Sequence, residues 1–183
     1  DQGPQASGVA WALAHGIAGH ARRSSYTPDE EPPASCAAET RVAKFYAALN
    51  QNDRKKDEGI DLLAAARYLV STGAPGCGAG EPAIRLRSVL RLQPDDLDGI
   101  RATLAAGTPV AVGMALYRDF YFLGSGSTRV YDRNSTTAGT GEFLGGHAVV
   151  LVGYDHSRAA FRFQNSFSWM SWQFLFSLEN ISL

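Results

Sequence analysis

A change in hydrophobic periodicity partway along the chain most constrains what it can fold into. Before about residue 80, apolar residues recur at helical spacing, as Val9, Leu13 and Ile17 do. After about residue 81, apolar residues gather in short runs bounded by glycine and proline, which is typical of buried strands. Helices followed by strands predict an α+β protein, with a mainly helical half over residues 1–80 and a mainly β half over residues 81–183.

Local signals place the individual elements within this plan. Ser7 is a candidate N-cap for the first helix, and Asp95 and Asp96 favour the start of a later helix that ends at Gly107. The intervals between these signals are rich in serine, glycine, proline or charge, and they predict loops. The expected helices cover residues 7–18, 39–49, 60–70 and 97–106, and the expected strands cover 88–92, 109–117, 148–154, 161–164 and 174–178.

Composition excludes several classes of protein. The chain has 183 residues, 45% hydrophobic and 19% charged, as expected for a single globular domain. Lysine and arginine number 17 against 18 aspartate and glutamate, so no overall field steers the chain to nucleic acid or an anionic membrane. No apolar run approaches the ~18 residues of a membrane-spanning helix. We therefore expect neither a nucleic-acid nor a membrane partner, and the oligomeric state stays open.

The two cysteines leave the cellular compartment open. Cys36 and Cys77 could form one bridge, which would suggest a secreted or other oxidising environment, or they could be two buried free thiols. Their spacing is not that of a zinc site, and we expect no metal and no other cofactor. Because the sequence begins at Asp1 rather than methionine, we also expect a processed or excised chain.

Three short segments together carry a resemblance to a known family. They are DQGPQASGVAWALA at 1–14, GGHAVVLVGYD at 145–155 and FRFQNS at 161–166. In order and spacing the chain resembles the papain family of cysteine peptidases, particularly its bacterial branch, over essentially its whole length. The resemblance implies a two-lobed α+β fold with a substrate cleft between the helical and β lobes.

The resemblance also implies a role for four positions. Gln2 matches the glutamine that donates a hydrogen bond to the oxyanion, His147 the catalytic histidine, and Asn165 the asparagine that orients this histidine. The family places its nucleophilic cysteine at the start of the first helix, where the helix dipole favours the thiolate. That position is Gly8 in this chain, so no acyl-enzyme can form there.

Further positions of the family's site are partly kept and partly changed. Gly145 and Gly146 match glycines that let the backbone pass close to the substrate. Phe167 stands where the family has a tryptophan that shields the asparagine–histidine hydrogen bond, and Trp169 lies in a segment that replaces a glycine-rich cleft wall. We predict that these four residues contribute to substrate or partner binding.

Two functions from different classes fit this pattern. The first is a catalytically inactive papain-like protein that binds a peptide or protein partner through the former substrate cleft. The second is an active cysteine peptidase whose nucleophile was replaced by Gly8 through engineering of the chain. A third possibility, in which His147 activates water directly, has neither a metal nor a covalent nucleophile in its favour.

Overall fold

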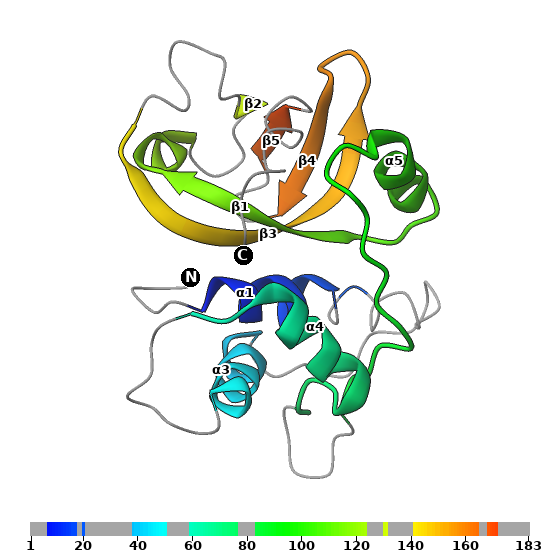
Figure 1. Cartoon of the computed structure of the whole chain (residues 1–183), viewed down its shortest axis with the longest axis vertical. Coiled ribbons are helices and arrows are strands. Elements are labelled where there is room, and N and C mark those ends of the chain that lie inside the picture. The colour runs from blue at the N-terminus through cyan, green and yellow to red at the C-terminus, as the bar shows by residue number, and fades with distance from the viewer. Residues whose placement is uncertain are drawn as a thin grey trace. The chain divides into compact units, whose positions relative to one another are not determined.

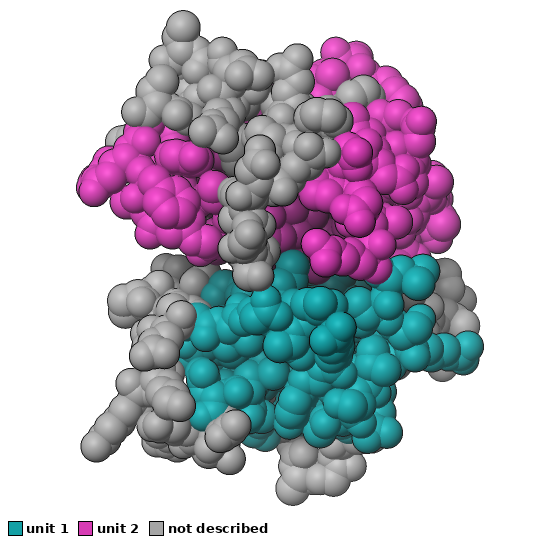
Figure 2. Space-filling model, viewed as in Figure 1, with its two compact units in different colours: residues 1–90 teal, residues 91–183 magenta. Residues whose placement is uncertain are grey.

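A computed structural model describes residues 7–17, 20, 38–50, 59–76, 83–123, 130–131, 141–164 and 168–171. For residues 38–40, 121–123 and 168–171 it describes the backbone alone. The chain divides into two compact units, Asp1–Leu90 (unit 1) and Arg91–Leu183 (unit 2), which Figure 2 shows in teal and magenta. The sequence suggests a division near residue 80.

Unit 1 is helical, as its periodicity predicts. It contains α1 (Gly8–Ala10), η1 (Trp11–Ile17), α3 (Ala38–Leu49) and α4 (Leu62–Ser71) (Figure 1). The first helix differs from expectation, because η1 winds as a π-helix rather than an α-helix. The spacing of apolar residues predicts which side chains a helix buries, but not whether the helix is α or π. Ala10, Leu13 and Ala14 are buried as predicted. The buried core of unit 1 also includes Val42, Phe45, Tyr46, Ala65, Leu69 and Ala74.

The segment after α4 is fixed by hydrogen bonds to the end of that helix. Gly73 ends the helix with φ +91°, a left-handed conformation that glycine adopts without strain. Ala74 and Ile84 then form a two-way backbone bridge, with N···O distances of 2.9 Å in both directions. Arg85 donates from Nη2 to the Ser71 carbonyl at 2.7 Å and from Nε to the Thr72 carbonyl at 3.1 Å. The guanidinium therefore satisfies carbonyls that the helix end leaves unpaired.

The strand predicted over residues 88–92 is wrong. This segment has no regular structure, and the Leu90 side chain is 87% exposed. Its apolar residues resemble a strand in the sequence, but a strand is stable only when its backbone pairs with a neighbour. The only pairing among the described residues of this region is the Ala74–Ile84 bridge, which lies before the segment.

In its described residues, unit 2 is a sheet with one α-helix packed against it. It contains α5 (Leu97–Ala105), β1 (Val110–Tyr117), the 3₁₀ helix η2 (Arg118–Leu123), β2 (Val130–Tyr131), β3 (Phe143–Asp155), β4 (Ala160–Gln164) and β5 (Ser168–Ser171). The described strands lie in the order β1-β3-β4-β5-β2. Their pairings are antiparallel, as predicted, except that β2 pairs with β5 in parallel. The strand predicted over 174–178 lies outside the described residues.

Strand β3 organises unit 2. It pairs with β1 on one side and with β4 on the other, and it runs as one long bent strand across the unit (Figure 1). Helix α5 packs against β3 and β1. The core between them is apolar and largely aromatic: Ile100, Met114, Phe120, Tyr131, Val149, Leu151, Phe161 and Phe163. Among the described residues, no helix combines the length and the apolar character that crossing a membrane requires.

Candidate functional site

Gly8 lies at the start of the first helix of unit 1, as the sequence predicts. It is the first residue of α1, it is buried, and Ser7 precedes it at the N-cap position. The Ser7 side chain makes no capping hydrogen bond, because its φ of −98° and ψ of 15° depart from the extended conformation typical of N-caps. Its hydroxyl is buried without a hydrogen-bond partner among the described residues. The predicted cap residue is therefore in place, but the predicted bond is not made.

His147 lies on β3 of unit 2, on the side of the sheet that faces the core. It stands opposite Met114 of β1 in the register, and Met114 is fully buried. Side chains directly opposite each other in an antiparallel pair point to the same face, so the imidazole lies beside the core rather than in solvent. The His147 side chain is half-buried.

A phenylalanine supports the imidazole from the core side. The ring of Phe120, in η2, meets His147 edge-on, with ring centroids 5.8 Å apart and an interplanar angle of 66°. Phe120 also stacks on Phe163 of β4 at 5.8 Å and meets Tyr131 of β2 at 5.4 Å. Edge-to-face and offset arrangements are the favoured geometries for aromatic pairs. The ring of Phe120 thus joins side chains from β2, β3 and β4 in one aromatic cluster that includes the histidine.

Tyr131 is a structural member of this cluster that the sequence does not reveal. It is fully buried, and its hydroxyl donates a hydrogen bond to Asp119 Oδ1 at 3.3 Å. Burial, followed by the nearby negative charge of Asp119, raises the pKa of the Tyr131 phenol well above its usual value. The phenol therefore stays neutral and serves as a hydrogen-bond donor. Its surroundings in the sequence are rich in glycine, serine and threonine and predict only a loop.

Gly145 and Gly146 lie in β3 immediately before His147. Gly145 has φ +138°, where other residues are strained, and no described residue lies within 4 Å of the position a Cβ would take. Gly146 is exposed. The strand therefore presents bare backbone next to the histidine, and a role of these glycines in the close approach of another chain stays a prediction.

The remaining predicted site residues are not placed by the structure. Gln2, Asn165 and Phe167 lie outside the described residues, as do Cys36 and Cys77. The backbone of Trp169 forms part of β5, opposite Arg162 of β4. Gly8 belongs to unit 1 and His147 to unit 2. The grouping of these residues in one cleft stays a prediction from the sequence.

The part of the chain that the structure describes holds no metal-binding cluster. No group of three or more histidine, cysteine, aspartate or glutamate side chains gathers there as metal ligands would.

Comparisons with known proteins bear on the fold. No family model matches the sequence, and no curated protein matches it either. Among solved structures, the chain is similar to xylellain, a cysteine protease from Xylella fastidiosa, with a TM-score of 0.68 and 21% sequence identity. The match covers 98% of this chain and 78% of that chain. The chain therefore has the papain-like cysteine protease fold, which confirms the predicted fold class.

Proposed function

We propose that this chain is a papain-like pseudopeptidase, which binds a peptide or protein partner where active members of the fold bind their substrate. The observation that carries the proposal is the glycine at the position of the nucleophile. Gly8 is the first residue of the first helix, where the resemblance places the catalytic cysteine, and it has no side chain to attack a peptide bond.

The size of this loss argues against turnover. In serine proteases, loss of the nucleophile costs a factor on the order of a million in turnover. By analogy this corresponds to roughly 8 kcal/mol of lost transition-state stabilisation. Oxyanion stabilisation and binding alone leave a residual factor of only ~10³–10⁴ over the uncatalysed reaction. Binding is therefore the activity that such a chain retains.

The surroundings of His147 favour a retained binding site. The imidazole is held against Phe120, and the two preceding glycines add no side chain beside it. These features belong to β3 and its core contacts, and they do not depend on a thiol at residue 8. An extended peptide lying along this strand would use backbone hydrogen bonds for affinity and side-chain contacts for selectivity.

A peptide-hydrolysis assay tests the proposal. The unaltered protein, Gly8→Cys, Gly8→Ala and Gly8→Cys combined with His147→Ala are incubated with a peptide library under reducing conditions. We expect no cleavage by the unaltered protein or by Gly8→Ala, which controls for the added Cβ. Cleavage by Gly8→Cys that disappears in the double variant would assign His147 as the base and would show that only the sulfur is missing.

The same assay separates this proposal from the alternative of a disabled peptidase. Activity of Gly8→Cys at the level of an efficient cysteine peptidase favours a chain that lost its nucleophile by engineering or by a recent natural change. An inactive Gly8→Cys, together with measurable peptide binding by the unaltered chain, favours binding as the function. Hydrolysis by the unaltered chain, or the absence of binding to any peptide tested, contradicts the pseudopeptidase proposal.

A further inference from the structure

Two large apolar side chains are exposed in succession at the start of β3. Phe143 is 59% exposed and Leu144 is 40% exposed, and both precede the Gly145–Gly146–His147 segment directly. The ring of Tyr117, at the end of β1, meets Phe143 edge-on with centroids 5.6 Å apart. We refer to Tyr117, Phe143 and Leu144 as the apolar patch.

A β-bulge explains why both side chains face solvent. In a regular strand consecutive side chains point to opposite faces, so one of two neighbours would be covered by the core. Here Leu116 pairs with Gly145 and Tyr117 pairs with Phe143, which leaves Leu144 as an extra residue on β3. Such bulges redirect side chains and are common beside functional sites.

The space and the charge around the patch indicate what it can receive. No described residue lies within 4 Å of the position that a Cβ on Gly145 would take, so no side chain stands between the patch and Gly146 along the strand. At its border, Arg118 pairs with Glu142 at 2.5 Å, and their side chains are 62% and 64% exposed. The two charges neutralise each other, so this border gives the patch no preference for an ion. An uncharged apolar group is the complementary ligand.

The first residues of β3 have a described strand partner on one edge. Strand β4 pairs with β3 only from Val150 onward, so among the described residues the segment 143–149 has a strand partner, β1, on one side alone. Successive residues of an extended chain are about 3.3 Å apart, so the patch lies roughly 13 Å along the strand from His147. This distance spans three to four residues of a peptide.

We propose that the apolar patch is a selectivity subsite, which receives a large apolar side chain of the bound peptide three to four residues away from the residue at His147. The inference rests on the proposed function, because it takes an extended peptide as the occupant. Phe143 and Leu144 provide the contact area, and Tyr117 holds the Phe143 ring in place.

Peptide selection, followed by affinity measurements on patch variants of the protein, tests the subsite. A phage-displayed library of random dodecapeptides is selected on the unaltered protein, and an enriched peptide is labelled with fluorescein for anisotropy measurements. Phe143→Ser and Leu144→Ser are compared with Val152→Ser, the matched control. Val152 is also exposed (38%) and lies at the second bulge of β3, between Leu151 and Gly153, away from His147.

We expect the selected peptides to share a large apolar residue at one position, and we expect its contribution to affinity to depend on the patch. Phe143→Ser and Leu144→Ser should each weaken binding of the apolar peptide by about 10-fold, the range for losing one apolar contact in a binding site. They should leave unchanged the affinity of the same peptide with serine at that position. Val152→Ser should change neither affinity. Circular dichroism of each variant shows whether the sheet is retained.

Three results would overturn the inference in distinguishable ways. Enriched peptides whose affinity is insensitive to both patch variants would refute the subsite and leave the proposed function standing. Failure to enrich any peptide would refute both proposals. Self-association of the unaltered protein that Phe143→Ser abolishes, without an effect on peptide affinity, would make the patch an interface between copies of the chain.

Discussion

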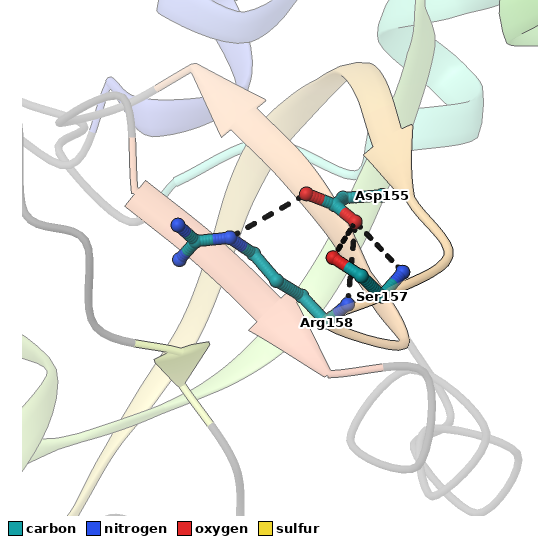
Figure 3. Close-up of polar contacts among 3 residues, drawn as sticks. All are labelled: Asp155, Ser157 and Arg158. Carbon is teal, nitrogen blue, oxygen red and sulfur yellow. Dashed lines mark hydrogen bonds and ion pairs between the residues drawn. The ribbon is translucent and has the colours of Figure 1, made fainter.

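Replacing Ala159 with glycine should stabilise the protein, because the β3–β4 turn forces this alanine into a left-handed conformation. Among the described residues, Ala159 alone has a positive φ (+47°) without being glycine. It ends the turn, where its N–H donates to the His156 carbonyl at 3.2 Å. The Asp155 carboxylate holds the turn by accepting from Ser157 N and Oγ at 2.8 and 2.6 Å and from Arg158 N at 3.2 Å (Figure 3).

The magnitude follows from two opposing terms. The left-handed conformation costs a residue with a Cβ roughly 1–2 kcal/mol. Glycine removes that cost but loses about 0.5–1 kcal/mol more backbone entropy on folding than alanine does. Ala159→Gly should therefore raise the free energy of unfolding by up to about 1.5 kcal/mol. For a chain of this size, that corresponds to an increase in melting temperature of up to roughly 6 °C.

Differential scanning calorimetry and urea unfolding measure this change. Ala106→Gly is the matched control, because Ala106 is also exposed at the end of an element but has φ −75°. Only the entropic cost applies there, so this variant should lose stability. If Ala159→Gly also loses stability, the strain assigned to this turn is absent and the reasoning fails.

Two further perturbations test local features of each unit. Arg85→Ala should lower the stability of unit 1 by about 1 kcal/mol, because the Ser71 and Thr72 carbonyls at the end of α4 lose their donor. Arg87→Ala, a change at an exposed neighbour, should stay within about 0.5 kcal/mol in urea unfolding, and equal losses would refute the capping role. The hydrogen bond from the Ser157 hydroxyl, followed by backbone N–H donors, lowers the pKa of Asp155. Its stabilising effect is therefore present above the unfolded-state pKa of about 4 and is lost as the pH falls through the lower folded-state pKa. Asp155→Asn should reduce the acid-side slope of unfolding free energy against pH, and an unchanged slope would contradict this assignment.

Elements with strong local signals could be predicted from the sequence. Helix α5 forms between the expected residues because Asp96 caps its start, accepting from Gly99 N at 2.9 Å, and Gly107 follows its end with φ +82°. Both signals act within a few residues and need no tertiary partner. The strand containing His147 was likewise predictable from its apolar run, although β3 begins five residues before the predicted 148.

Features that depend on a partner strand could not be predicted. The bulge at Leu144 arises from the register between β1 and β3, and no local pattern fixes this register. The failed strand at 88–92 shows the converse, because among the described residues no backbone pairs with it. Phe120 is similar: the aromatic residues around it in the sequence favour burial but name no partner for its ring, and only the packing of η2 on β3 and β4 places it against His147.

The proposed loss of catalysis and the proposed binding belong to different parts of the chain. The nucleophile position is the first residue of α1, in unit 1, whereas the bare backbone and the apolar patch belong to β3, in unit 2. A cysteine side chain at residue 8 would contribute to bond making in the transition state, and such interactions raise turnover rather than affinity. Gly8→Cys should therefore leave the affinity for a selected peptide within a few-fold of that of the unaltered chain. A gain or loss of affinity beyond 10-fold would mean that residue 8 takes part in recognition, and that binding does not reside on β3 alone.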